Sequence, residues 1–408
     1  MIFKRKLYDK LLVWKQQTAG TKALLIEGAR RIGKSTLVEE FAKNEYRSYL
    51  MIDFNKVSDS VISAFNNYMN DLDTFFLILS SEYGVRLYPK ESIIIFDEIQ
   101  QFPKARQAIK YLVADGRFDY IETGSLISIK ENVNDITIPS EERTLLMYPM
   151  DFEEFAWAMN EEPLMAYIRQ CFDKKVPLEQ GIHAKAMLLF RQYMIVGGMP
   201  KSLSAYLENN RNFEMADMEK RDILTLYRND IKKIKSGYRS SVLSIFDQIP
   251  AFLSRSERRV VMNRIEKGAS FPKYHDTFFW LSDSMIANEC FNCSDPNVGL
   301  SLNEDRTYVK CYMGDTGLLI SHTFDENEIS DGELYREILL GKLSVNEGMF
   351  YENVIAQMLV AAGHKLYFYT RYNQEKHRND MEIDFILSNH SKLRYKIFPI
   401  EVKSNDKY

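Results

Sequence analysis

The chain has little cysteine and no long apolar run. Its 408 residues include only four cysteines, Cys171, Cys290, Cys293 and Cys311, too few for a disulfide scaffold and typical of a reducing compartment. No stretch approaches the roughly 20 apolar residues that a membrane-spanning helix needs. Residues 1–6 carry charge but are not followed by the apolar segment of a signal peptide. We therefore expect a cytoplasmic globular protein of two or three domains, with no repeats.

The chain also lacks a positive net charge. Fifty-three Lys and Arg against 57 Asp and Glu give a net charge of −4, so any nucleic-acid site must be a local patch. Residues 230–239 and 255–259 are locally basic, and fit either phosphate contacts or, more commonly, solvated helix faces. Cys290 and Cys293 form a C-x-x-C without a second pair, which favours two core or surface thiols over a zinc site.

One stretch organises the chain. Residues 28–35, GARRIGKS, fit the phosphate-binding pattern G-x-x-x-x-G-K-[ST]. An apolar run at 23–26 precedes it, and Leu37, Val38 and Phe41 follow at helical spacing. In a strand–loop–helix setting, backbone N–H groups and the helix N-terminus bind phosphate oxygens. This setting disfavours the alternative, a chance match on a surface glycine turn.

The pattern assigns a role to each loop residue. Lys34 is expected to contact the β- and γ-phosphates, and the Ser35 hydroxyl to bind Mg²⁺. The predicted ligands are therefore ATP and Mg²⁺. The expected nucleotide-binding residues are Gly28, Arg30, Arg31, Ile32, Gly33, Lys34, Ser35 and Thr36.

A second motif follows at residues 92–100, where an apolar run ends in Asp97 and Glu98. Such a run is typical of a buried parallel strand, whose carboxyl end faces the ligand in an open α/β sheet. Asp97 is expected to bind Mg²⁺, and Glu98 to activate water as general base. The alternative is a strand that ends in a solvated acidic turn.

Thr123 and Ser125 end a further apolar run that begins at residue 120. They fit γ-phosphate sensing and turn formation equally well. The candidate catalytic residues are thus Lys34, Glu98, Thr123 and Ser125.

The remaining patterns predict an α/β fold. Asp151 is a candidate helix cap, and residues 160–345 are mostly helical in pattern. We expect helices at 3–17, 59–83 (broken near Asn70 and Asp71) and 102–115, and strands at 49–54 and 145–148.

The C-terminal segment differs in character. Residues 351–362 show a helical apolar stripe with Glu352 at its edge, followed by strands at 381–387 and 395–403 with a turn at 388–391. Glu401 and Lys403 would share one strand face, with Asp384 on the partner strand. Two carboxylates and a lysine fit metal-dependent hydrolysis. A surface ion pair on an alternating strand is the alternative.

Together the motifs resemble a widespread microbial family of AAA-superfamily ATPases, whose members join an ATPase domain to a C-terminal region of uncharacterised function. Two features depart from it: Glu142–Arg143 stands where the family shows Gly-Arg, and the family continues past Glu-Val-Lys with a helix and a strand. The resemblance rests on residues 28–35, 96–100, 123–125, 148–155, 196–200, 315–319, 382–385 and 400–404.

The resemblance implies an AAA-type parallel sheet, a helical and winged-helix-like middle, and an incomplete restriction-endonuclease-like end of the PD-(D/E)xK type. Glu352, Asp384, Glu401 and Lys403 fill its metal-nuclease positions. The implied divisions are 1–158 (ATPase), 159–240 (helical linker or lid), 241–345 (winged-helix-like) and 346–408 (nuclease-like).

The resulting functional hypothesis is Mg²⁺-dependent ATP binding and hydrolysis, coupled to nucleic-acid-associated work. One alternative is a nucleotide-dependent switch that acts through protein partners, with an inactive nuclease-like end. Another is an ATP-binding module with negligible turnover. DNA and protein partners thus both stay open, as does the oligomeric state, and no membrane partner is expected.

Overall fold

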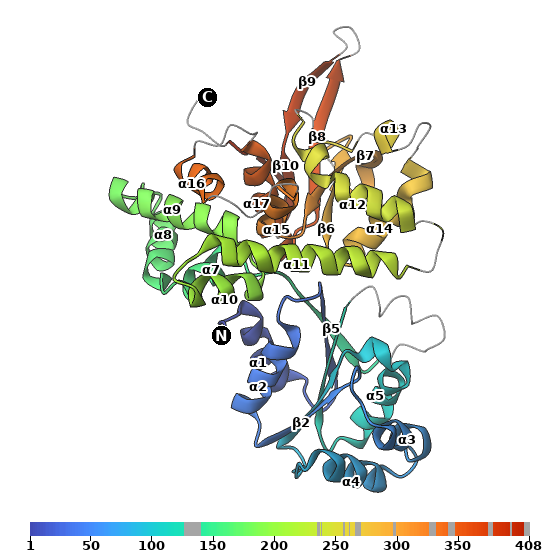
Figure 1. The fold of residues 1–408 in the computed structure, drawn as a ribbon. Coiled ribbons are helices and arrows are strands. Elements are labelled where there is room, and N and C mark those ends of the chain that lie inside the picture. Colours follow the sequence, from blue (N-terminus) through green and yellow to red (C-terminus); the bar gives the residue numbers. More distant parts are fainter. Residues whose placement is uncertain are drawn as a thin grey trace. The chain divides into compact units, whose positions relative to one another are not determined.

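The computed structural model describes residues 1–125, 140–234, 237, 239–255, 258–260, 262–265, 271–296, 299–325, 332–341, 347–373, 378–391 and 394–403. The chain divides into two compact units, Met1–Tyr148 and Pro149–Tyr408 (Figure 1). Each unit has a β-sheet of its own. None of the described helices combines the length and apolar character needed to cross a membrane.

The first unit is built on a parallel sheet in the order β2-β3-β4-β1-β5. Every residue of β1 and β3 is buried, as expected for central strands covered by helices on both faces. The predicted α/β class is confirmed. The strands are β1 (Ala23–Gly28), β2 (Ser48–Asp53), β3 (Ser92–Asp97), β4 (Asp119–Gly124) and β5 (Glu142–Met147).

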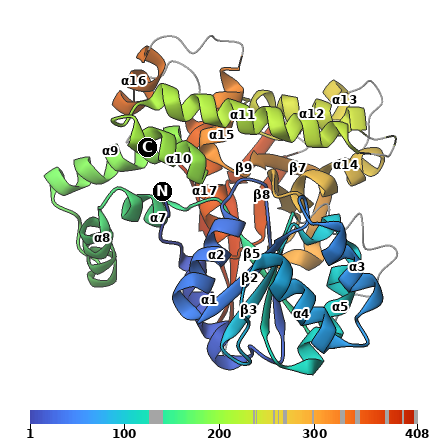
Figure 2. The same cartoon turned by 60° about the horizontal axis from the view of Figure 1, so that its bottom comes forward.

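Helices cover both faces of this sheet. Figures 1 and 2 show α1 and α2 on one face, and α3, α4 and α5 on the other. The second face carries a core rich in aromatic rings, in which Phe65 packs edge-on against Phe75 and Phe96. The helices are α1 (Lys6–Gln17), α2 (Lys34–Glu45), α3 (Asp59–Asn67), α4 (Leu72–Tyr83) and α5 (Pro103–Asp115), with a 3₁₀ turn η1 (Ile99–Gln101).

Side-chain caps mark the start of α4 and of α7 (Phe152–Ala158). Asp71 accepts a hydrogen bond from the Thr74 N–H and starts α4, which accounts for the predicted break near that residue. Asp151 and Glu154 form a reciprocal capping box at the start of α7, so the predicted Asp151 cap is confirmed.

The second unit is helical in its first part. Its helices are α7 (Phe152–Ala158), α8 (Glu162–Lys174), α9 (Gln180–Val196), α10 (Pro200–Glu208), α11 (Phe213–Lys232), α12 (Arg239–Leu253), α13 (Met262–Ile265), α14 (Phe271–Asp283), α15 (Thr316–Thr323), α16 (Glu333–Leu340) and α17 (Gly348–Ala361), with a 3₁₀ turn η3 (Leu300–Asn303).

Its strands form a four-stranded sheet in the order β7-β6-β8-β9 and a separate β10–β11 pair. The sheet joins β6 and β7 to β8 and β9, across the predicted boundary at residues 345 and 346. β6 and β7 were missed because their polar residues break a period-two pattern. The strands are β6 (Ala287–Cys293), β7 (Glu304–Met313), β8 (Leu366–Asn373), β9 (Arg378–Ile383), β10 (Phe385–Ser391) and β11 (Arg394–Ile400).

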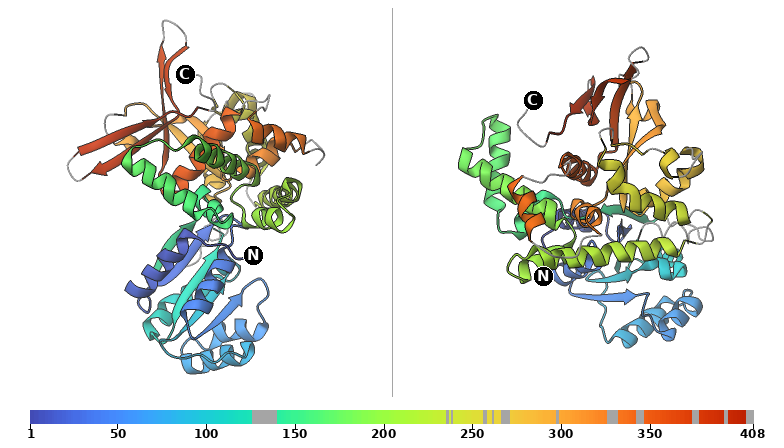
Figure 3. Two further views of the ribbon diagram at one scale, coloured as in Figure 1. Left: turned by 90° about the vertical axis from the view of Figure 1, so that its left-hand side faces the viewer. Right: turned by 45° about the horizontal axis from the view of Figure 1, so that its top comes forward.

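The C-terminal hairpins differ from the expectation. β10 runs through the predicted turn at 388–391 and pairs with β11 from Phe385 to Ser391. Asp384 lies at the bend between β9 and β10, and Glu401 and Lys403 follow β11 instead of lying in it. At this bend the chain leaves the four-stranded sheet, so that the β8–β9 and β10–β11 hairpins project in different directions (Figure 3, left).

Candidate active site

The phosphate-binding pattern lies where the sequence placed it, between β1 and α2. Gly28 ends β1, and a Cβ at this position would collide with the backbone carbonyl oxygen of Met147 on β5, so the position requires glycine. Gly33 has φ 92° and Arg31 has φ 67°, both in the left-handed region that curls the backbone tightly. α2 begins at Lys34, which places a helix N-terminus at the loop.

Lys34 is buried beneath this loop. Its ammonium donates hydrogen bonds to the carbonyl oxygens of Gly28 (3.0 Å) and Ala29 (2.8 Å). Burial lowers the pKa of Lys34 to about 8, although the nearby carboxylates of Glu98 and Asp97 act in the opposite direction. The lysine is therefore a poorly solvated cation in contact with the loop, where an anionic ligand would stabilise its charge.

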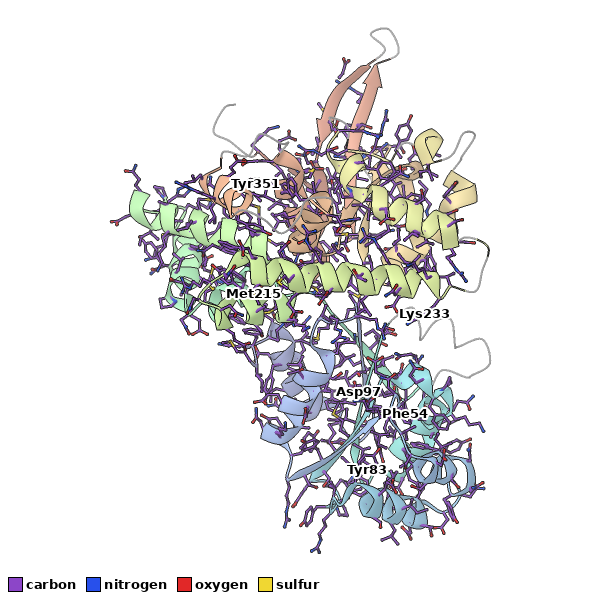
Figure 4. All side chains as sticks on the ribbon, in the orientation of Figure 1. Phe54, Tyr83, Asp97, Met215, Lys233 and Tyr351 are labelled. Atoms are coloured by element: carbon purple, nitrogen blue, oxygen red, sulfur yellow. The ribbon has the colours of Figure 1, made fainter. Side chains whose placement is uncertain are left out.

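Two predicted site residues converge on the carboxylate of a third, Asp97. Ser35 Oγ donates a hydrogen bond to Asp97 Oδ1 at 2.7 Å, and the Thr123 hydroxyl donates to the same oxygen. They come from α2, β3 and β4, whose ends meet at the carboxyl edge of the sheet. Figure 4 shows Asp97 close to Phe54, whose N–H donates to the Asp97 carbonyl at 3.1 Å. A hydroxyl and a carboxylate at this spacing are oxygen ligands of the kind Mg²⁺ prefers.

Glu98 occupies a constrained position directly after β3. Its φ of 55° lies in the left-handed region, which non-glycine residues adopt rarely and often at functional sites. Its backbone N–H donates to Thr123 Oγ1 at 3.4 Å, and its carboxylate accepts a hydrogen bond from Gln100. The structure therefore brings Glu98 next to the Asp97–Thr123 pair.

The other predicted site residues differ in exposure. Ile32 and Ser125 are buried, Arg30 is half-buried, and Arg31 and Thr36 are exposed. The assignment of these five residues to nucleotide binding or catalysis stays a prediction.

The sequence patterns do not predict the role of Arg5. Its buried guanidinium donates hydrogen bonds to the carbonyl oxygens of Ile32 (3.0 Å) and Tyr148 (2.6 Å). It thereby fixes the phosphate-binding loop to the segment that follows β5. A single arginine outside any motif gives no signal for such contacts, which span 27 and 143 residues.

Glu142, the departure from the family pattern, has a structural partner. Arg106 of α5 binds its carboxylate through two parallel hydrogen bonds of 2.9 and 2.7 Å. Arg143 is exposed. Burial, together with the neighbouring Glu142 carboxylate, holds the pKa of Glu122 well above its usual value, which favours the neutral form of this side chain.

The acids of the second unit gather around a lysine. Lys310 of β7 lies 3.1 Å from Glu352, 3.1 Å from Glu382 and 3.9 Å from Asp384. Glu352 is fully buried in α17 instead of lying at the edge of its stripe. The Glu401 and Lys403 side chains are exposed and pair with each other. The described residues include no group of three His, Cys, Asp or Glu arranged to hold a metal, and the predicted metal site at Asp384 and Glu401 stays a prediction.

The basic stretches at 230–239 and 255–259 are described except for residues 235, 236, 238, 256 and 257, and several of the described side chains contact their own chain. Lys233 pairs with Asp230 at 3.1 Å, Arg239 donates to the Ile234 carbonyl at 2.9 Å, and Arg258 pairs with Glu352. These contacts add no support for a nucleic-acid site, and the alternative of solvated helix faces stays a prediction. Cys290 and Cys293 are buried free thiols, in line with core packing.

Comparison with known proteins supports the nature of the first unit. Residues 20–156 match the model of the AAA domain family. Residues 187–328 and 347–408 match two domains of unknown function, DUF8612 and DUF4143. No curated protein matches the chain. The N-terminal match, the parallel sheet and the loop geometry agree, and together they support an AAA-type P-loop fold for this part of the chain.

Similar solved structures include AMPPCP-bound DnaA from Aquifex aeolicus, with 10% identity over 69% of this chain and 90% of that chain, at a TM-score of 0.26. A point variant of RuvB from Thermotoga maritima shows 12% identity, 72% and 90% coverage, and a TM-score of 0.29. Cdc6p from Pyrobaculum aerophilum shows 11% identity, 83% and 93% coverage, and a TM-score of 0.27. At these TM-scores the likeness carries no argument about this chain.

Proposed function

We propose that the first unit binds ATP with Mg²⁺ at the phosphate-binding loop and hydrolyses the bond between the β- and γ-phosphates. The observation that carries the proposal is the convergence of Ser35 and Thr123 on Asp97, directly beside the loop and Lys34. Packing alone does not require this cluster. Burying polar groups costs free energy unless they are hydrogen-bonded, and apolar residues would fill the same space at a lower cost in free energy.

Each residue has a chemical task in this proposal. Lys34 exchanges its two loop carbonyls for phosphate oxygens, and Arg5 keeps the Ile32 carbonyl turned away from the ligand. Ser35 and Asp97 would hold Mg²⁺, which neutralises charge on the phosphates when bound. Glu98 accepts a proton from the attacking water, and Thr123 and Ser125 contact the γ-phosphate end of the ligand.

The test is ATP binding measured by calorimetry in the presence of Mg²⁺. Lys34→Ala removes a charge-assisted hydrogen-bond donor, worth on the order of 2 kcal/mol or about 30-fold in affinity. Lys43→Ala is a matched control, because Lys43 is on the same helix but pairs with Glu39 in solvent. Equal affinities of the wild type and Lys34→Ala would overturn the proposal.

We extend the proposal to nucleic-acid-associated work, which is supported by the family resemblance. Its test is DNA binding over a salt series, because phosphate contacts make the affinity fall steeply with salt. Salt-dependent binding and stimulation of ATP turnover by DNA would support it. Turnover without any DNA binding at low salt would instead favour a nucleotide-dependent switch acting on protein partners.

A further inference from the structure

The acidic cluster of the second unit contains a buried cation of its own. The Lys310 side chain is 1% exposed and the Glu352 side chain 0%. The Lys310 ammonium lies between Glu352 of α17, Glu382 of β9 and Asp384 of the following bend, at 3.1, 3.1 and 3.9 Å. Three carboxylates from three segments of the chain thus surround one positive charge.

Further groups contact Glu352 and Asp384. Glu352 accepts a hydrogen bond from the Tyr312 hydroxyl and pairs with Arg258. Asp384 accepts a hydrogen bond from the Val402 N–H at 2.8 Å through its second oxygen. Lys310 also lies 5.0 Å from the centre of the Phe368 ring, which favours a cation at this place. The carboxylates are therefore oriented toward Lys310 and its neighbours.

Mg²⁺ and Mn²⁺ would need the same oxygens. A divalent ion bound to Glu352, Glu382 and Asp384 would lie about 2 Å from each carboxylate oxygen. It would then lie within a few ångströms of the buried ammonium. Two cations so close in a poorly solvated site repel each other strongly. Removing the ammonium alone would leave three clustered carboxylates with the single counter-charge of Arg258, which pairs with Glu352. Glu382 is 30% exposed, so an ion could reach the cluster from solvent on that side.

We propose that the Lys310 ammonium takes the place of a divalent cation in this cluster. The second unit therefore binds no Mg²⁺ or Mn²⁺ among these acids while Lys310 is present, and Lys310 holds β7, α17 and the β9–β10 bend together. Replacing Lys310 by a neutral side chain of similar length turns the same three carboxylates into a site for one hard divalent cation.

The test is Mn²⁺ binding to the full chain, without nucleotide, followed through the free Mn²⁺ signal in electron paramagnetic resonance. All proteins carry Asp97→Asn, which removes the carboxylate proposed for the other metal site. The Asp97→Asn protein is called the parent. Adding Lys310→Met should make it bind Mn²⁺ at least about tenfold more tightly than the parent, because one positive charge next to the metal has been removed. Adding Asp384→Asn should abolish the gain, and Lys310→Arg, which keeps the charge, should show none.

The parent protein tests the proposal even if Lys310→Met does not fold. Mn²⁺ binding by the parent that is lost in parent/Asp384→Asn would overturn it, because Lys310 would then coexist with the metal. A folded Lys310→Met protein with no gain in Mn²⁺ affinity would overturn it as well. Superimposable Mn²⁺ isotherms of the parent and parent/Asp384→Asn support it.

Discussion

Ser35 Oγ donates a hydrogen bond of 2.7 Å to Asp97 Oδ1 across 62 residues of sequence. This contact joins the phosphate-binding loop directly to the acidic end of β3. Thr123 donates to the same oxygen, so the carboxylate is positioned by two hydroxyls from neighbouring elements. The site is therefore organised by side chains before any ligand arrives, which reduces the ordering cost of binding.

Glu98→Gln should separate binding from hydrolysis. The amide keeps the size and the hydrogen bond to Gln100 but cannot accept a proton from water. ATP affinity should stay within about threefold of the wild type, while turnover falls by roughly 10²-fold or more. Calorimetry and a phosphate-release assay measure the two quantities. An unchanged turnover rate would remove Glu98 from the role of general base.

ATP binding should be coupled to proton uptake by Lys34 in alkaline solution. Burial lowers the pKa of Lys34 to about 8 from 10.5, and phosphate oxygens nearby would raise it again. At a pH between the pKa of Lys34 in the ligand-free protein and its higher pKa in the complex, Lys34 is deprotonated without ATP and protonated with ATP. ATP affinity should therefore fall as the pH rises above about 8, while ATP phosphates themselves are already ionised there.

Calorimetry at about pH 8.5 in two buffers of different ionisation enthalpy measures this uptake directly, with a fraction of one proton expected per ATP. Near pH 6.5 the Lys34 contribution should vanish, because the lysine is protonated in both states. Between about pH 8 and 10.5 Lys34 is protonated in the unfolded chain but deprotonated in the folded, ligand-free protein. Over this range Lys34 therefore makes the free energy of unfolding of the ligand-free protein rise with pH. An ATP affinity that is constant from pH 7 to 9.5 would contradict the assignment.

The sequence predicted the first unit well because its signals are local. Apolar runs marked β1, β3 and β4, and the motifs after them named Lys34, Ser35, Asp97 and Thr123. Arg5 and Lys310 escaped prediction because their partners are distant in sequence. Lys310 lies 42 residues from Glu352, and no period or spacing reveals such a pair.

The C-terminal errors have a similar origin. The Glu-x-Lys pattern predicted a shared strand face, but the strand ends at Ile400 and leaves Glu401 and Lys403 beyond it. The apolar stripe predicts a single buried face of α17, whereas Glu352, Asn353 and Gln357 are buried as well. Asn353 accepts a hydrogen bond from the Met313 N–H and donates one to the Met313 carbonyl, and Gln357 accepts one from the Thr316 N–H. Polar residues therefore line part of this helix's buried surface.

Arg5→Ala should weaken ATP binding although Arg5 is not expected to touch the ligand. It removes the donors to the Ile32 and Tyr148 carbonyls and frees the loop to rearrange. We expect KM for ATP to rise about tenfold, and kcat at saturating ATP to change by less than about threefold. Arg5→Lys, which retains one donor group, should recover part of the affinity.

The exposed Lys10 of α1 provides a matched control, because Lys10→Ala removes a nearby charge of the same sign. A merely structural role of Arg5 would lower thermal stability without moving KM at temperatures where the variant is folded. Wild-type KM in a folded Arg5→Ala protein would therefore show that Arg5 does not position the loop.

Gly197→Ala should destabilise the second unit selectively. Gly197 has φ 80°, and a Cβ there would collide with Asp315 Oδ1 and lie 3.0 Å from Gly317 Cα. Asp315 cannot yield easily, because its buried carboxylate accepts hydrogen bonds from the N–H groups of Gly198 and Leu318 and from Gln357. We expect a loss of about 2–4 kcal/mol in the free energy of unfolding.

Hydrogen–deuterium exchange locates this effect, with faster exchange expected in α9, α15 and α17, which pack around the Gly197–Asp315 contact. The control is Gly181→Ala in α9, where a Cβ meets nothing within 4 Å. Alanine at this open helical position should be neutral or stabilise the protein by up to about 1 kcal/mol. If Gly197→Ala unfolds at the same denaturant concentration as Gly181→Ala, the buried contact between the 196–200 and 315–319 motifs does not limit the stability of this unit.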